Sequence, residues 1–441
     1  MVQQVMTGAR SSEFTARSLT VAGSAMAATM FSSMVFAMTA IAVFMERIAA
    51  DYHWGHGQIG AAVTILSVGM AISSRIFGPL VDRLGPRAVT LPLTFLSGLT
   101  LAGFSLLWSS LPAFYAAHFL LGLGSPGAVA HSKLIATWFF RRRGIALTVM
   151  ALGAAFAQMI LPPLTRAVMD AIGWHRTYLV FGLGGLLICF PILLAFYRER
   201  TVARDDASAG DHSSGEVAPD GAPRIRIRDA MAGRTYWLII GMQIAGIFAY
   251  SGIGTHALGI LGEQGVAPDY RIWGLSLLAF GTLAAQIGIG FLLDLFDTPR
   301  VVIPFALAAM GGLILMAVGQ GNGTVLAGVL LFGLGTGGET GMTSYFISRY
   351  FGVRNFSTIY GSLFLLLLIG SSGSVVVGLI FDRTGSYGPA LVAVAGALLI
   401  AMLLLWRLGP YPYPVKHGDE SSAARDGETP LARTDPSPQA G

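Results

Sequence analysis

Residues 121–127 read Leu-Gly-Leu-Gly-Ser-Pro-Gly, and residues 332–338 read Phe-Gly-Leu-Gly-Thr-Gly-Gly. The two stretches align without a gap at a spacing of about 211 residues. Asp170 recurs at nearly the same spacing as Asp382. A chain that repeats itself at such a long spacing is built from two halves of the same architecture.

The composition predicts that both halves lie in a membrane. Of the 441 residues, 54% are hydrophobic and 12% are charged, whereas a soluble domain carries roughly 25% charged residues. The mean hydropathy is +0.66. A membrane-spanning helix needs about 20 apolar residues. The runs without Asp, Glu, Lys or Arg are 18–45, 57–74, 88–132, 144–165, 177–197, 235–262, 272–293, 301–338, 355–381 and 384–406.

These runs predict twelve membrane-spanning helices. The run 88–132 is long enough for two of them. The run 301–338 contains one helix and the start of another, which continues past Glu339 to about Tyr350. The first run, 18–45, is longer than the roughly 7–15-residue apolar core of a signal peptide. We therefore expect it to be retained as the first helix.

The distribution of basic residues orients the predicted helices. With the N-terminus in the cytoplasm, 21 of the 28 Lys and Arg residues lie on the cytoplasmic side and 5 lie outside. Membrane proteins show this positive-inside bias. The net charge of +5 is thus explained by topology, and nucleic acid is not a predicted partner. Twenty-six Arg against two Lys is typical of a GC-rich bacterial genome, which favours the bacterial inner membrane.

The charged and polar segments divide the chain into five predicted parts. They are a cytoplasmic tail at 1–17, a six-helix bundle at 18–197, a cytoplasmic linker at 198–234, a second bundle at 235–408 and a disordered cytoplasmic tail at 409–441. The linker is dense in charge and cannot bury apolar area, so a flexible segment is expected there. Both termini are predicted to be cytoplasmic. No disulfide can form within the chain, because Cys189 is its single cysteine.

The second predicted cytoplasmic turn carries a family signature. Residues 78–87 read Gly-Pro-Leu-Val-Asp-Arg-Leu-Gly-Pro-Arg. This resembles the motif between helices two and three of the major facilitator superfamily. The matching residues are Gly78, Asp82, Arg83, Gly85 and Arg87. The resemblance implies an all-α membrane protein with twelve transmembrane helices in two pseudo-symmetric six-helix bundles, which rock to expose a central substrate site to each side in turn.

The same resemblance suggests a cytoplasmic gate. Asp82 is placed to meet the positive N-terminal end of helix eleven, beside Arg354. The sequence repeat predicts a matching contact between Asp294 and the start of helix five, beside Arg143. Both contacts would hold the cytoplasmic side shut in one state and break in the other. The alternative is that these charges only anchor the loops in the cytoplasm.

Glu339 is the most informative ionisable residue within the predicted helices. A carboxylate near the middle of a membrane is costly and is usually functional. Without a neighbouring cation it would take up a proton readily. Glu339 is therefore a candidate for proton coupling, and the alternative is a structural hydrogen bond to a neighbouring helix. The aligned position in the first half is Ala128.

Several other polar residues are candidates for the central cavity. His118 occupies a helix-four position that is often Arg in the family, and it either takes part in proton coupling or packs as a neutral side chain. His256 follows a glycine-rich stretch of helix seven, where gating and plain packing are both open. Lys133 either reaches the cytoplasm or offers charge to an anion. Gln158 and Gln243 are suitable hydrogen-bonding partners for a polar substrate.

Four other classes of site are excluded by the sequence. Residues 122–127 match the G-x-G-x-x-G pattern of dinucleotide sites, but they lie within an apolar helix and have no preceding strand, so they indicate helix packing. No phosphate-binding lysine motif is present, and ATP is not the predicted energy source. The scattered His residues do not form a metal set, and no nucleophile is paired with a base. The protein is therefore predicted to have no cofactor and to be no enzyme.

The predicted function is proton-coupled uptake of a small organic anion, such as a monocarboxylate, by a protein that works as a monomer. Pro162-Pro163, residues 173–176 (Gly-Trp-His-Arg) and residues 350–354 (Tyr-Phe-Gly-Val-Arg) are similar to the oxalate/formate and monocarboxylate porter branch. The basic substrate residue of that branch has no counterpart in helix eight. Export of hydrophobic or cationic compounds is the main alternative. A non-transporting nutrient receptor on the same fold is the remaining one.

Overall fold

The computed structural model describes residues 15–106, 110–125, 127–139, 143–199, 227–296, 298–337, 339–351 and 368–411. Within these ranges the chain is helical, with short turns between the helices and no β-strand. The membrane-spanning character of these helices follows from their composition. Apolar side chains cover most of each long helix, as expected of helices that face lipid on one side and other helices on the other.

The first half of the chain forms one bundle. Its helices are α2 (Ala16–Met30), α3 (Ser33–Tyr52), α4 (His56–Leu84), α5 (Pro86–Gly103), α6 (Leu111–Leu123), α7 (Gly127–Trp138), α8 (Arg143–Ile172), α9 (Trp174–Gly184) and α10 (Phe190–Phe196). Together α2 and α3 form the first predicted span, which is interrupted at Phe31 and Ser32. A π-helical turn at Gly185–Cys189 joins α9 to α10.

The second half forms the other bundle. Its helices are α11 (Ile227–Ala232), α12 (Arg234–Glu263), α13 (Pro268–Leu295), α14 (Ile303–Val318), α15 (Asn322–Thr336), α16 (Glu339–Phe351), α18 (Gly373–Thr384) and α19 (Gly388–Trp406). The short α11 falls inside the predicted linker and packs against the start of α12. Tyr411, in the predicted tail, is buried against Tyr345 and Tyr350 of α16.

In the described part of the chain, nine helices are long and apolar enough to cross a membrane. Two further apolar helices, α6 and α15, are shorter, and each is continued by a second segment, α7 or α16. The eleventh predicted helix is described only from residue 368 onward. The all-α membrane fold is thus confirmed, and the count of twelve stays a prediction.

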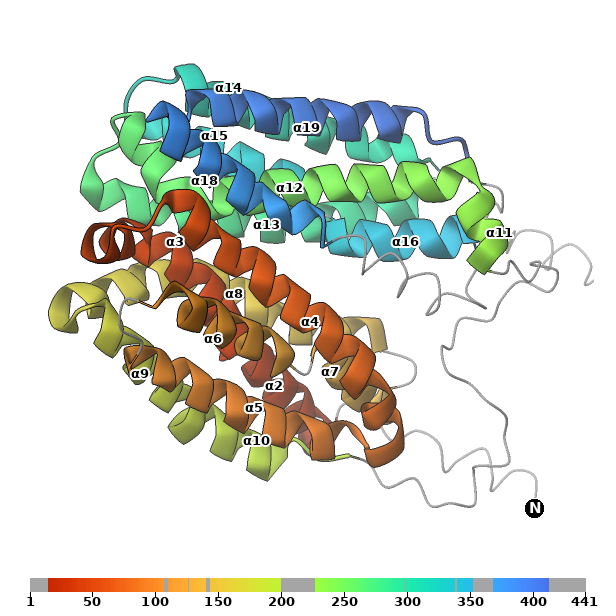
Figure 1. Cartoon of the computed structure of the whole chain (residues 1–441). Coiled ribbons are helices and arrows are strands. Elements are labelled where there is room, and N and C mark those ends of the chain that lie inside the picture. Colours follow the sequence, from red (N-terminus) through yellow and green to blue (C-terminus); the bar gives the residue numbers. More distant parts are fainter. Residues whose placement is uncertain are drawn as a thin grey trace, which may run out of the picture.

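The two bundles lie close together at one end of the molecule and separate toward the other (Figure 1). The close end contains the start of α4 and the ends of α3, α12 and α18, and we call it the His56 end. The opposite end contains the end of α4 and the starts of α8 and α12, and we call it the linker end. The main contacts between bundles join α4 to α18, α8 to α13 and α3 to α12.

The glycines of the repeated stretch make the same helix contact in both bundles. A Cβ added at Gly122 of α6 would overlap the carbonyl oxygen of Leu66 in α4. A Cβ added at Gly333 of α15 would overlap the carbonyl oxygen of Leu278 in α13 in the same way. Small residues allow two helix backbones to approach closely. The prediction that this pattern serves packing is therefore confirmed.

The repeated stretch also ends a helix in both bundles. In the first bundle α6 ends at Leu123, and α7 begins at Gly127. In the second bundle α15 ends at Thr336 and α16 begins at Glu339, so the continuous helix predicted from 324 to 350 is two helices. Glycine weakens a helix interior by roughly 1 kcal/mol relative to alanine, and several glycines in succession favour an interruption at this point.

Candidate functional site

In the described part of the chain, the hydrogen bonds that join the two bundles lie between mid-height and the His56 end. Near the middle of α8 and α12, the Tyr250 hydroxyl donates to Oε1 of Gln158 at 3.1 Å. Closer to the His56 end, the Thr64 hydroxyl donates to the carbonyl of Ser371 at 2.9 Å. The Ser374 hydroxyl donates in the opposite direction to the carbonyl of Gly60, at 2.9 Å. These bonds are neutral, so the helices can separate without exposing an unpaired charge.

A carboxylate of the second bundle caps the first turn of a helix in the other bundle. Oδ1 of Asp382 accepts from the backbone N–H of His56 at 2.8 Å, and Oδ2 accepts from the N–H of Gly57 at 2.9 Å. Asp382 lies near the end of α18, and the two donors begin α4. The first N–H groups of a helix have no partner within the helix and carry partial positive charge. Asp382 therefore supplies an N-terminal cap across the bundle interface.

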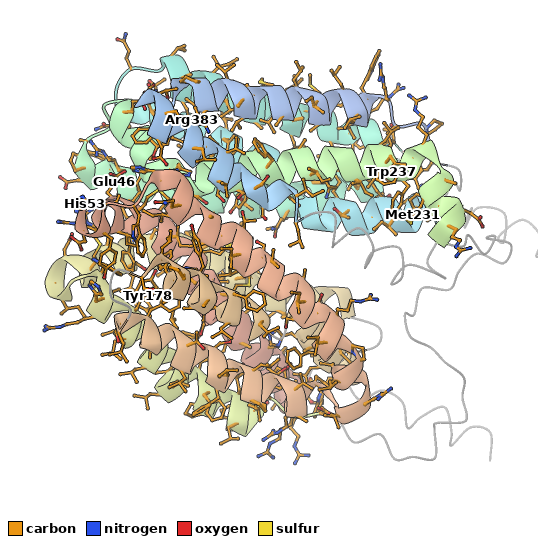
Figure 2. The ribbon with its side chains drawn as sticks, viewed as in Figure 1. Glu46, His53, Tyr178, Met231, Trp237 and Arg383 are labelled. Carbon is orange, nitrogen blue, oxygen red and sulfur yellow. The ribbon has the colours of Figure 1, made fainter. Side chains whose placement is uncertain are left out.

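The side chain of His56 lies between two carboxylates. Its Nδ1 is 3.3 Å from Oδ1 of Asp382, and its Nε2 is 3.5 Å from Oε1 of Glu46 in α3. The His56 side chain is 13% exposed, Asp382 is 25% exposed and Glu46 is 62% exposed. Figure 2 shows Glu46 at the His56 end, where the two bundles meet. The cluster therefore combines residues of both bundles and is reached by solvent through Glu46.

Glycines allow α4 and α18 to meet at this end. A Cβ built at Gly60 would lie 2.6 Å from the carbonyl oxygen of Ser374. A Cβ built at Gly378 would overlap the backbone of Gly57. At the other end of α4, no atom of the described chain lies within 4 Å of a Cβ built at Gly78. Within the described part of the chain, α4 thus has no room for a side chain at Gly60 and has room for one at Gly78.

One basic residue of the family signature, Arg87, is held within the first bundle. Arg87 donates from its two terminal nitrogens to the carbonyls of Tyr197 at 2.8 Å and Leu194 at 2.7 Å, which satisfies the end of α10. Its backbone N–H donates to Glu199 at 2.6 Å. Arg83 is exposed, and Gly85 has a φ of +90°, a backbone conformation that favours glycine.

The partners predicted for the cytoplasmic gate lie outside the described part of the chain. This applies to Arg354 and to the side chains of Asp82, Asp294 and Arg143. The side chain of Glu339 also falls outside it, although its backbone position is described as the first residue of α16. The gate and the role of Glu339 therefore stay predictions.

His118 lies in the aromatic core of the first bundle. It is completely buried, and its ring packs against Phe104 and Phe114 at centroid distances of 4.8 and 4.3 Å. Its Nδ1 lies 2.8 Å from the carbonyl of Phe114 in the same helix. Its Nε2 has no hydrogen-bond partner among the described residues. These surroundings suit a neutral ring that packs.

His256 is buried behind the interface at the His56 end. Its Nε2 lies 2.8 Å from the carbonyl of Ser374, and its Nδ1 lies 3.4 Å from the Tyr387 hydroxyl. A neutral ring satisfies both contacts, by donating to the carbonyl and accepting from the hydroxyl. The ring centroid of His256 is 6.4 Å from that of His56. The structure therefore brings His256 beside the Asp382 cluster, far along α12 from the mid-height pair.

The other polar candidates occupy separate places. Gln158 joins the bundles at mid-height through Tyr250, as described above. Gln243 donates to the hydroxyl of Thr343 within the second bundle. Lys133 donates to the carbonyl of Val81 at 2.9 Å and so binds near the end of α4.

Sequence reasoning did not identify His56 or Glu46. Asp382 was visible as the repeat counterpart of Asp170, but the repeat did not reveal its partner. Asp170 pairs with Arg166 of its own helix at 2.7 Å, whereas Asp382 reaches the other bundle. A histidine and a glycine at the start of a helix carry no sequence signal for such a contact. Within the described ranges, no three His, Cys, Asp or Glu side chains are grouped as a metal site requires.

Comparison with known proteins supports a transport fold. Residues 25–371, more than half of the chain, match the model of the Major Facilitator Superfamily. The 4-hydroxybenzoate transporter PcaK of Acinetobacter baylyi is 22% identical over 76% of this chain and 82% of its own. Monocarboxylate transporter 11 of Mus musculus is 24% identical over 83% of this chain and 80% of its own. Monocarboxylate transporter 4 of Rattus norvegicus is 23% identical over 84% and 79%.

These matches cover both bundles and agree with the apolar helices and the internal repeat described above. The relatives are named as transporters and not as enzymes. We conclude that this chain is a multi-pass membrane transporter that belongs to the Major Facilitator Superfamily.

Proposed function

We propose that the protein transports its substrate by alternating access, and that the described conformation is closed at the His56 end. The observation that carries this proposal is the position of the described hydrogen bonds between the bundles, which lie from mid-height to that end. The linker end is assigned to the cytoplasm by the excess of basic residues predicted there. The substrate would then leave toward the cytoplasm in this conformation.

The proposed substrate is a small organic anion, such as a monocarboxylate, taken up together with a proton. The names of two relatives support this class, because 4-hydroxybenzoate and the substrates of monocarboxylate transporters each carry a carboxylate. The hydrogen bond between Gln158 and Tyr250 places two polar groups of opposite bundles at mid-height. A substrate that separates the bundles at this level would replace that bond with its own.

Glu339 is the proposed site of proton coupling. It begins α16, directly after the interruption between α15 and α16. Neutralising it by protonation would let the loaded carrier reorient without moving a buried charge through the membrane. His118 and His256 are secondary candidates for the same role, and Lys133 and Gln243 for contact with the substrate.

The test is uptake of 4-hydroxybenzoate and of a short aliphatic monocarboxylate into proteoliposomes, with and without an inward proton gradient. Uptake stimulated by the gradient supports the proposal. Glu339→Gln is expected to abolish the stimulation while leaving exchange of internal for external substrate intact. Asp229→Asn, a change at an exposed residue of α11, is the matched control. Stimulation by the gradient that survives Glu339→Gln would remove Glu339 from the coupling mechanism.

Export of hydrophobic or cationic compounds remains the second candidate. An apolar cavity with one acidic residue would suit lipophilic cations. Raised drug resistance on overexpression, without any carboxylate uptake, would favour export over the proposal. A receptor without transport activity would bind the carboxylate but show neither uptake nor exchange.

A further inference from the structure

The cluster at the His56 end differs from the hydrogen bonds at Thr64, Ser374 and Gln158, because it contains carboxylates and an imidazole from both bundles. Glu46 comes from α3, His56 from α4 and Asp382 from α18. The neutral contacts deeper in the interface can break without a change in charge. Separating the charged cluster changes the surroundings of its ionisable groups, so the protonation of these groups is linked to opening and closing.

We propose that His56 is a proton-binding latch, whose protonated imidazole ties Glu46 and Asp382 together and so closes this end of the transporter. The proposal rests on the alternating-access function above and adds a proton site to it. The ligand is a proton from the solution at this end. It binds the ring nitrogen that carries a lone pair in neutral imidazole.

The geometry explains why a proton favours closure. A neutral imidazole has one N–H, so one of its nitrogens would direct a lone pair at a carboxylate oxygen. With both nitrogens protonated, the ring carries a positive charge 3.3 Å from Oδ1 of Asp382 and 3.5 Å from Oε1 of Glu46, so it can form an ion pair with each carboxylate. Its Nε2 is buried and has no hydrogen-bond partner among the described residues. Opening the interface would remove Asp382 and leave α4 without its cap. The proton and the closed interface therefore stabilise each other, and this coupling is reciprocal.

The other charged and titratable groups around the cluster are accounted for. His256 of α12 faces His56 at a centroid distance of 6.4 Å, but its two nitrogens are engaged by Ser374 and Tyr387. Arg271 of α13 donates from Nε to the carbonyl of Val266, and its positive charge also acts on Glu46. The carboxylate of Glu263 accepts from the backbone N–H of Tyr387 at 2.6 Å and so caps α19. These engagements leave His56 as the ring placed between two carboxylates.

The direction of the effect suits an importer. In the form that is open at the His56 end, Asp382 no longer faces His56 and the ring loses a carboxylate partner. A proton captured from the outside would favour closure at this end, behind the incoming substrate. Release of that proton would favour the return to the form that is open to the outside.

The experiment measures the distance across this end in the full-length protein in lipid nanodiscs, without substrate. Spin labels are placed at Ala171→Cys in α8 and Tyr270→Cys in α13, two exposed positions of opposite bundles, with Cys189→Ser as background. Double electron–electron resonance then gives the ratio of the closed to the open form between pH 8 and pH 5.5. A tenfold preference of the proton for the closed form would raise this ratio by up to about tenfold.

Three variants decide the outcome. His56→Gln is expected to make the ratio independent of pH, and Glu46→Gln, at a largely exposed residue, to reduce the response. His53→Asn is the matched control, because His53 is an exposed histidine at the same end with a φ of 57°, which asparagine tolerates. It should keep the full response. A wild-type ratio that does not change with pH, or a full response in His56→Gln or Glu46→Gln, would overturn the latch.

The measurement is independent of the substrate proposal. If the ratio depends on pH through His56 but no carboxylate is taken up, the latch stands and the proposed substrate is wrong. If uptake occurs and the ratio does not depend on His56, the transport proposal stands and the latch is wrong.

Discussion

At the scale of single residues, the repeat gives Asp170 and Asp382 equivalent places in the two halves but different partners. Asp170 forms a salt bridge within its own helix with Arg166, and both side chains are nearly half exposed. Asp382 accepts two backbone hydrogen bonds from the opposite bundle. An exposed ion pair contributes little, whereas a carboxylate that caps a helix N-terminus contributes more. Of these two equivalent residues, Asp382 therefore joins the two bundles, whereas Asp170 binds within its own helix.

This difference gives a matched pair of variants. Asp382→Asn keeps the shape but removes the charge at the start of α4, and we expect it to weaken the closed form by about 1–2 kcal/mol. The closed-to-open ratio at pH 7 would then fall roughly 5- to 30-fold. Asp170→Asn should leave the ratio unchanged, because its partner lies in its own helix. The 171–270 distance measurement described above checks both, and an equal effect of the two variants would contradict the assignment.

At the scale of the helices, α4 has two ends with different requirements. Near the His56 end, Gly57 and Gly60 face α18 with no room for a side chain. Near the linker end, no described atom lies within 4 Å of a Cβ built at Gly78. The family signature predicts that the helices around Gly78 approach when the cytoplasmic side closes. Close helix contacts of α4 would then form at Gly57 and Gly60 in the described state and at Gly78 in the opposite state.

Two alanine variants of α4 test this alternation. Gly60→Ala places a methyl group 2.6 Å from a backbone oxygen, and overpacking of this kind costs about 1–3 kcal/mol, so the closed form at the His56 end should be depleted. Gly78→Ala should enrich that form, because it obstructs only the opposite state. The resonance distance between residues 171 and 270 should lengthen in the first variant and shorten in the second. Shifts of the same sign would be inconsistent with alternation.

At the scale of the whole molecule, one set of contacts holds each bundle together and another set joins the two bundles. Packing of small residues holds each bundle together, as in the equivalent crossings of α4 with α6 and α13 with α15. In the described part of the chain, the contact between bundles combines close packing of α4 on α18, apolar side chains such as Ala257 and Leu275, hydrogen bonds and the charged cluster at the His56 end. A bundle that is internally rigid can move as a unit relative to its partner.

The orientation of the whole molecule can be checked by labelling from outside the cell. In the Cys189→Ser background, a membrane-impermeant maleimide should react with Ala171→Cys at the His56 end and not with Asp229→Cys at the linker end. The physical reason is the excess of Arg predicted on the cytoplasmic side. Permeabilised cells serve as the control, since both positions should then react. Labelling of Asp229→Cys alone in intact cells would invert the proposed topology.

The sequence by itself determined the membrane class, the duplication and the packing role of the repeated glycines, because these depend on composition and on helix periodicity along short stretches. It did not determine the interruption before Glu339 or the partners of Asp382. The helix break depends on how far the glycines weaken the helix and on how the neighbouring helices pack against it. The contact of Asp382 with His56 joins residues 326 positions apart. Such a contact exists only when the bundles meet, and no local pattern encodes it. The tertiary structure alone decided that α4 and α18 meet at the His56 end.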